Sequence, residues 1–269
     1  MTDVVLDPTQ LYHVAATERR DDRTRVLKHA DTFAVFDAVG DASGDGPHEQ
    51  GLYHLGTRHV STLELRVDGY RPLLLSSTLL ESSEVLTVDL TNPDMQLGDD
   101  RRLANGQIHL HRMKFLWEAT CYEQVVAVNY GPVALEISIE LNVEADFADI
   151  FEVRGTGRLQ RGRRLPTLLT SDGLVYAYHG LDGVTRKTAV SCDPPPRQDA
   201  EGRLHFDLMI APRESVDVYV AIECDRSREQ GTKLLPFAPA LAAAREATST
   251  NSGRCPQIET VIPASETRR

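Results

Sequence analysis

Two histidines separated by one residue, His109 and His111 in the segment IHLH, have the type and spacing that could bind a metal ion. Alternate residues of a β-strand point to the same face, so both imidazoles could reach one ion. Two ligands are too few without a third, and six residues separate His111 from the next carboxylate, Glu118. We therefore predict no metal here, and we interpret the pair as the rim of an apolar strand face that continues through Met113, Phe115 and Trp117.

Other catalytic patterns point to no site either. Hydrolysis of a glycosidic bond needs two carboxylates that face each other across the bond. The chain has 40 acidic residues, and nothing in their spacing selects such a pair. It contains no Gly-x-Ser-x-Gly elbow and no phosphate-binding glycine loop, and His48, His54 and His59 do not fit a helical HExxH motif. The sequence therefore predicts no catalytic residue, no metal and no cofactor.

Composition excludes several classes of partner. A net charge of −11 over 269 residues argues against nucleic-acid binding, which needs clustered basic residues. The basic run at residues 158–164 (RLQRGRR) is short, and we interpret it as a solvated loop. No secretory signal and no membrane-spanning apolar stretch is evident, and the four cysteines are too scattered for a zinc site or a disulfide framework. We expect a cytoplasmic protein that binds neither nucleic acid nor membrane.

A period of two dominates the elements that would position any site. Apolar residues take every second position in residues 133–143, 203–210 and 216–224, with polar residues between them. One face of each segment is then buried and the other is wet, which is typical of antiparallel strands. Asp68-Gly69 predicts a tight hairpin turn, because both residues tolerate positive φ. These signals predict an all-β, antiparallel fold.

The end of the chain has a different character. Residues 237–247 (FAPALAAAREA) are rich in alanine, which loses no side-chain entropy in a helix, and they predict one short C-terminal helix. The residues after this segment are polar and show no clean pattern. We therefore divide the chain into an N-terminal extension (residues 1–23), a β-sandwich domain (residues 24–236) and a helical linker with a tail (residues 237–269).

Three stretches resemble a known family. The first is residues 51–77 (GLYHLGTRHVSTLELRVDGYRPLLLSS), and the second is residues 146–162 (DFADIFEVRGTGRLQRG). The third is the strand pair between them, which ends in EISIELNVEAD. Together they resemble the N-terminal domain of bacterial glycogen-debranching enzymes, the amylo-alpha-1,6-glucosidase-like proteins, over nearly the whole ordered chain.

The resemblance implies a large two-sheet sandwich of the supersandwich type that acts as a non-catalytic accessory domain. In that family an (α/α) barrel glycosidase domain follows and supplies the catalytic carboxylates. The implied partner is such a barrel, in cis or in trans, with an α-glucan as a further ligand. We predict that the chain alone does not hydrolyse glucosidic bonds.

The resemblance also directs attention to residues that could contact the barrel or the substrate. The candidates are Arg58, Asp146, Phe147, Asp149, Phe151, Glu152 and Arg154. In one interpretation Phe147, Ile150 or Phe151 anchors the partner while the charged side chains fix its register. In the other, the three apolar residues lie in the domain's own core and the charges only close the turn after a strand.

Two alternative functions remain open. A mutarotase-like enzyme would need a histidine acid and a glutamate base on one sugar ring, for which His109, His111 and Glu118 could serve. A free-standing carbohydrate-binding module would display exposed aromatic residues. The chain has one tryptophan and 6% aromatic residues, so we rank the module third.

Overall fold

The computed structural model describes residues 24–44, 49–80, 84–97, 101–199, 202–225 and 234–252. The predicted N-terminal extension and the end of the tail, together with His48 and Cys255, lie outside these residues. Strands make up 57% and helices 7% of the chain, which confirms the predicted all-β class. No helix in the described ranges is long and apolar enough to cross a membrane.

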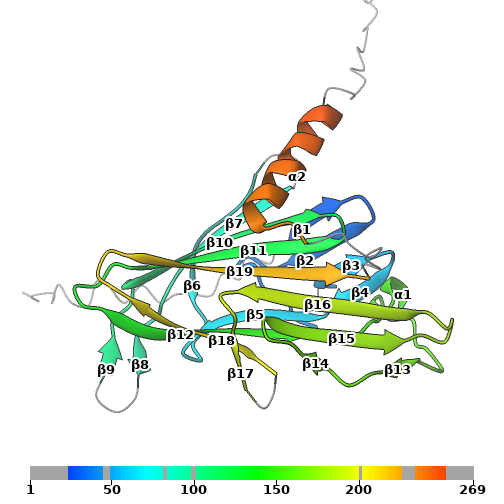
Figure 1. Cartoon of the computed structure of the whole chain (residues 1–269), viewed down its shortest axis with the longest axis horizontal. Coiled ribbons are helices and arrows are strands. Elements are labelled where there is room, and N and C mark those ends of the chain that lie inside the picture. Colours follow the sequence, from blue (N-terminus) through cyan, green and yellow to red (C-terminus); the bar gives the residue numbers. More distant parts are fainter. Residues whose placement is uncertain are drawn as a thin grey trace, which may run out of the picture.

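One layer of the sandwich is a nine-stranded sheet in which every pairing is antiparallel (Figure 1). Its strand order is β13-β15-β16-β19-β11-β10-β7-β6, and β14 pairs with β15. The strands are β6 (Leu73–Leu80), β7 (Val85–Thr91), β10 (Ile108–Trp117), β11 (Thr120–Asn129), β13 (Arg163–Arg164), β14 (Leu168–Leu169), β15 (Gly173–His179), β16 (Thr185–Asp193) and β19 (Ser215–Cys224).

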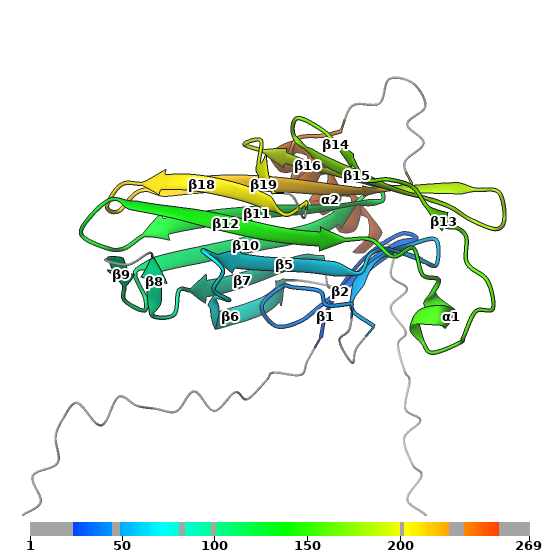
Figure 2. The same cartoon turned by 90° about the horizontal axis from the view of Figure 1, so that it is seen from below.

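Two four-stranded sheets pack against the inner face of this layer (Figure 2). The first has the order β17-β18-β12-β5, and the second has the order β1-β2-β3-β4; β8 and β9 form a separate ribbon. The strands are β1 (Arg25–His29), β2 (Thr32–Phe36), β3 (Gly51–His54), β4 (Thr57–Val60), β5 (Thr62–Val67), β8 (Met95–Leu97), β9 (Arg101–Leu103), β12 (Leu135–Glu144), β17 (Arg197–Gln198) and β18 (Leu204–Ile210). The main apolar core draws buried residues from all three sheets.

The predicted alternation places this core. In β12 every residue of one face is buried, and the residues between them are exposed or half-buried. Strand β18 follows the same rule, with all four apolar positions buried. Because a one-residue slip would turn the apolar face to solvent, this alternation fixes the register of β12 against β18 and β5.

The turn at Asp68-Gly69 forms as predicted, but the predicted hairpin is wrong. Both residues have positive φ, and Val67 and Tyr70 exchange backbone hydrogen bonds of 2.9 Å. The pairing stops there, because Pro72 has no N–H to donate. Strand β5 then pairs with β12 in one layer, while β6 joins β7 at the edge of the other. The turn is therefore a crossing between layers.

A cluster of buried charges lies between the layers. Arg112 Nη1 donates to Asp41 Oδ1 at 2.6 Å, and Arg112 Nε donates to Glu123 Oε1 at 2.7 Å. Lys114 Nζ donates to Glu123 Oε2 and lies 4.9 Å from the ring centroid of Phe36. No side chain of the four is more than 5% exposed. We call Asp41, Arg112, Lys114 and Glu123 the core ion cluster; its two positive and two negative charges balance.

Glu123 in the core ion cluster is an exception to the interpretation of acidic residues on strands. We expected most of the acidic residues that alternate with apolar ones to lie on the solvent-exposed face of their strands. Glu123 instead points inward beside Val125, because the inner faces of β10 and β11 carry charges of both signs that pair with each other. A buried carboxylate is tolerated only with such partners.

Three cysteines, Cys121, Cys192 and Cys224, are buried and unpaired. Burial raises the pKa of Cys121 and of Cys192 to about 12, and it raises the pKa of Cys224 well above its usual value. Thiols with a raised pKa stabilise the fold fully below the unfolded value near 9.0, and that contribution is lost as the pH rises through about 12.

We therefore expect the free energy of unfolding, measured by urea denaturation, to fall steadily above about pH 9. At pH 8, in a Cys255→Ser background, an aromatic disulfide reagent should label these three thiols only after the protein is unfolded. Stoichiometric labelling of the native protein would contradict the burial of the thiols.

The predicted C-terminal helix is α2 (Phe237–Ser252), which extends five residues beyond the predicted end at Ala247. It lies on the outer face of the nine-stranded sheet, opposite the two smaller sheets (Figure 1). Ala240 is completely buried there and packs in a second apolar cluster with Phe115 and Tyr122. The apolar strand face predicted beyond His109 and His111 is thus covered by this helix.

Candidate functional site

The candidate residues predicted from the sequence meet at one end of the sandwich, where β12 ends and β4 begins. Arg58 in β4 donates from Nη2 to Asp146 Oδ2 at 2.5 Å and from Nε to both carboxylate oxygens at 3.2 Å. Burial lowers the pKa of Arg58, but the hydrogen bonds and attraction of Asp146 outweigh it, so the net pKa is raised. Arg58 therefore stays charged and ties β4 to the end of β12.

The short helix α1 (Ile150–Val153) follows, and Asp149 begins it as N-cap. One carboxylate oxygen of Asp149 accepts hydrogen bonds of 2.9 Å from the backbone N–H groups of Phe151 and Glu152. These donors would otherwise be unpaired at a helix start. The backbone N–H of Ile150 donates to the Gly56 carbonyl at 2.9 Å, which joins α1 to the turn between β3 and β4.

Arginines neutralise the acidic side chains of this block. Arg158 contacts Asp149, and Arg161 Nε lies 3.0 Å from Glu152 Oε1. Arg154 pairs instead with an acidic residue from outside the block, since its Nε lies 3.2 Å from Glu49 Oε2. The basic run that we interpreted as a solvated loop therefore has a specific role, because Arg158 and Arg161 hold it against α1. We call residues 146–164 the signature block.

The two phenylalanines of the signature block have different environments. Phe147 is 5% exposed, and its ring stacks on Tyr178 and meets His59 edge-on, with both centroid distances 5.6 Å. Phe151 is 65% exposed. Leu55, in the adjoining turn, is 67% exposed. Phe147 thus belongs to the domain's own core, whereas Phe151 and Leu55 form an accessible apolar surface.

His109 and His111 flank one carboxylate on the neighbouring strand. His111 Nδ1 lies 2.9 Å and His109 Nε2 lies 3.1 Å from Asp89 Oδ1. Burial raises the pKa of Asp89, but hydrogen bonds from His111 and Ser76 outweigh it, so the pKa is lowered. Within the residues that the structure covers, no group of three or more His, Cys, Asp or Glu side chains is arranged to hold a metal ion.

Glu118 does not join this pair. It lies in the turn after Trp117, at the opposite end of β10 from His109. At about 3.3 Å per residue it is on the order of 20 Å from His111. The acid–base constellation of a mutarotase, as we assembled it from these three residues, is therefore not formed.

Comparison with known sequences identifies the family. The profile of the N-terminal domain of some glycogen debranching enzymes matches residues 27–221. This chain belongs to that family. The match runs from β1 into β19 and includes the signature block with its ion pairs, so the block is part of the debranching-enzyme N-terminal domain. None of the curated proteins matches the sequence.

Solved structures share only a general likeness with this debranching-enzyme domain. A protein described as a kojibiose phosphorylase from the human microbiome is 10% identical, with a TM-score of 0.49; the match covers 85% of this chain and 32% of that one. A protein described as an aldose 1-epimerase from Escherichia coli K12 is 8% identical, with a TM-score of 0.40 and coverages of 75% and 98%. This chain thus spans about a third of the length of the phosphorylase.

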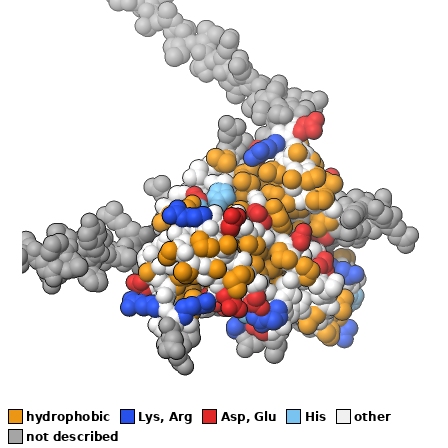
Figure 3. Space-filling view, turned by 60° about the vertical axis from the view of Figure 1, so that its left-hand side comes forward, with side chains coloured by type: hydrophobic (Ala, Val, Ile, Leu, Met, Phe, Trp, Pro, Cys, Tyr) orange, Lys and Arg blue, Asp and Glu red, His pale blue; other side chains and the backbone are white. Residues whose placement is uncertain are grey.

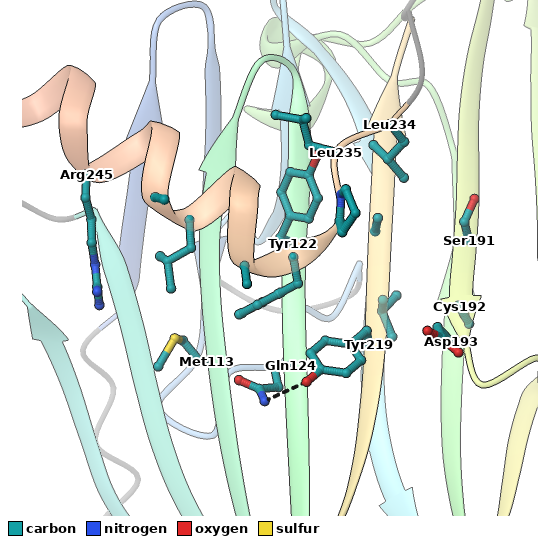
Figure 4. A pocket seen from close by; sticks show the side chains of 17 residues that line it. Met113, Tyr122, Gln124, Ser191, Cys192, Asp193, Tyr219, Leu234, Leu235 and Arg245 are labelled. Atoms are coloured by element: carbon teal, nitrogen blue, oxygen red, sulfur yellow. Dashed lines mark hydrogen bonds between the residues drawn. The ribbon is translucent and has the colours of Figure 1, made fainter.

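A groove between α2 and the nine-stranded sheet was missed by sequence analysis. Its volume is about 650 Å³ (Figure 4). Its residues come from β10, β11, β16, β19, α2 and the segment before α2, so no contiguous stretch of sequence could have predicted it. Its lining includes Met113, Gln124, Ser191, Asp193, Tyr219, Phe237, Leu241 and Arg245.

Proposed function

We propose that this chain is the non-catalytic N-terminal accessory domain of a debranching-type glycosidase that acts on glycogen or a related α-glucan in the cytoplasm. It packs against an (α/α) barrel catalytic domain, in cis or in trans. Membership of the debranching-enzyme N-terminal family supports the general role. The type of partner, its substrate and the compartment are parts of the proposal.

The carboxylates of the signature block are suited to structure rather than to hydrolysis. Asp146 is held by Arg58, Asp149 caps α1, and Glu152 pairs with Arg161. A glycosidase needs one carboxyl group that protonates the leaving group and a second that is placed for attack. Carboxylates already engaged with guanidinium and backbone N–H groups are poor candidates for either role, which supports an accessory function.

The exposure of Phe151 is the observation that carries the proposed contact. Phe151 is 65% exposed, on a helix whose charged side chains are already paired. Contact of this ring with water is unfavourable, whereas burial in an interface would stabilise a complex. On the side of the molecule away from α1, Figure 3 shows apolar side chains that gather over a broad area reaching up to α2, with most Lys and Arg near its rim. Apolar surface of this extent favours a domain that a partner covers.

Phe151→Ala tests the proposed contact. We expect it to weaken association with a separately expressed barrel domain from a complete relative at least tenfold, because a buried aromatic anchor is lost. Titration calorimetry would measure the affinity. The far-ultraviolet circular dichroism spectrum should not change, since Phe151 lies outside the core.

Met209→Ala is the matched control, because Met209 in β18 is also 65% exposed and lies outside the signature block. It should leave the affinity unchanged. Equal effects of the two substitutions, or none from Phe151→Ala, would place the contact elsewhere. No association of the unmodified domain would reject the accessory role itself.

A further inference from the structure

The groove beneath α2 is elongated. Arg245 lies at one end and Ser191 and Asp193 at the other, with Met113, Gln124 and Tyr219 between them (Figure 4). The helix supplies the opposite wall through Phe237 and Leu241. A volume of about 650 Å³ lies within the range of roughly 300–1,000 Å³ that is typical of small-molecule sites.

Aromatic side chains shape the groove. The rings of Tyr219 and Phe237 lie 5.5 Å apart and are tilted by 52°, and Phe237 also meets Phe115 edge-on. Both Tyr219 and Phe237 are only partly buried. The faces of such rings offer flat apolar platforms, while the tyrosine hydroxyl adds a polar group at the ring edge.

Polar groups in the groove have hydrogen-bonding capacity to spare. Gln124 Nε2 donates to Asp217 Oδ1 at 2.7 Å and to the Tyr219 hydroxyl at 3.2 Å. The Gln124 carbonyl and the Tyr219 proton remain available. The side chains of Ser191, Asp193 and Arg245 make no hydrogen bond or ion pair with other described residues. The set thus offers both donors and acceptors beside an apolar floor.

This combination selects the chemistry of the ligand. A purely apolar occupant would bury the Gln124 carbonyl and the Asp193 carboxylate without partners, which is unfavourable. The opposite charges of Asp193 and Arg245 at the two ends disfavour a ligand of either net charge. A neutral carbohydrate fits both conditions, because its hydroxyls donate and accept while its ring faces are apolar.

We infer that the groove between α2 and the nine-stranded sheet binds a linear segment of α-glucan, with a sugar ring on Tyr219 and hydroxyls on Gln124, Asp193 and Arg245. The choice of α-glucan rests on the proposed function. The site lies on the outer face of the sheet and is distinct from the signature block, so it would hold the glucan chain without performing chemistry on it.

Titration of the full chain with maltoheptaose, an α-1,4-linked glucose oligomer, tests the site. Calorimetry should show saturable binding, and the fluorescence of Trp117, the one tryptophan of the chain, should shift because Trp117 packs on the cluster beneath α2. Tyr219→Ala and Asp193→Ala should each weaken binding about tenfold or more. Tyr130→Ala, which alters an exposed tyrosine outside the groove, should have no effect.

Absence of saturable binding, or equal affinity of Tyr219→Ala and the unmodified chain, would overturn the inference. The loss of maltoheptaose affinity in Tyr219→Ala counts only if the circular dichroism spectrum of that variant is unchanged. If Tyr219→Ala unfolds, Asp193→Ala alone tests the inference, because Asp193 is exposed and its loss should not disturb the fold. A third outcome would also overturn the inference: the unmodified chain does not bind maltoheptaose, but Tyr219→Ala no longer associates with the barrel domain. The groove would then be a protein interface. The accessory role is judged separately by Phe151→Ala.

Discussion

Glu123→Gln is expected to lower the free energy of unfolding by about 3–5 kcal/mol, because it removes one partner of a buried ion pair. The substitution leaves Arg112 and Lys114 in the core with only Asp41 to balance them. Urea denaturation followed by circular dichroism would measure the loss. Glu136→Gln, on the exposed face of β12, is the matched control and should change stability by no more than about 0.5 kcal/mol.

The double variant Lys114→Met/Glu123→Gln separates charge balance from packing. It removes one charge of each sign and leaves Arg112 paired with Asp41 at 2.6 Å. Part of the stability lost in Glu123→Gln should return, although the second charge has also been removed. If Glu123→Gln is as stable as Glu136→Gln, the prediction is contradicted, and water must reach the charged side chains of the core ion cluster.

The core ion cluster also affects how the stability of the protein depends on pH in acid. Burial raises the pKa of Glu123, but Arg112 and Lys114 outweigh it, and the net pKa lies below the usual value of 4.5. A folded pKa below the unfolded value stabilises the protein above about pH 4.5, and this contribution is lost as the pH falls through the folded pKa. Asp41 acts in the opposite direction, since burial raises its pKa.

Phe147→Ala is expected to destabilise the domain by about 3–5 kcal/mol, because it empties a space between Tyr178 and His59. Phe151→Ala, four residues later, should change stability by no more than about 0.5 kcal/mol. Thermal and urea unfolding of both variants would test the contrast. Similar stability of the two proteins would return Phe147 to the list of partner contacts.

The fold was predictable wherever one rule decided the structure. The alternation in β12, β18 and β19 placed one face of each strand in the core, and the composition of residues 237–247 predicted the start of α2. Pairing between strands was not predictable. Asp68-Gly69 forms its turn, but whether the next strand folds back or crosses to the other layer depends on partners far away in the sequence, such as β7 and β12.

The candidate site was half predictable for a similar reason. The resemblance singled out Arg58 and the signature block, and the structure brings them together through the Arg58–Asp146 pair. It could not separate Phe147 from Phe151, because the inward turn of Phe147 depends on a backbone with φ of 52°. The core ion cluster was missed because Arg112, Lys114 and Glu123 occupy positions that an alternating pattern also allows at the surface.

The position of β19 bears on how the protein is made. Among the described residues β19 is the last strand in the sequence, yet it lies inside the nine-stranded sheet between β11 and β16. During synthesis on the ribosome, β11 and β16 must each wait with an unpaired edge until residues 215–224 emerge. Open edges of this kind are templates for pairing with other chains. A nascent chain that stalls before β19 would therefore be prone to aggregate, and chaperones that shield strand edges would be needed most at that point.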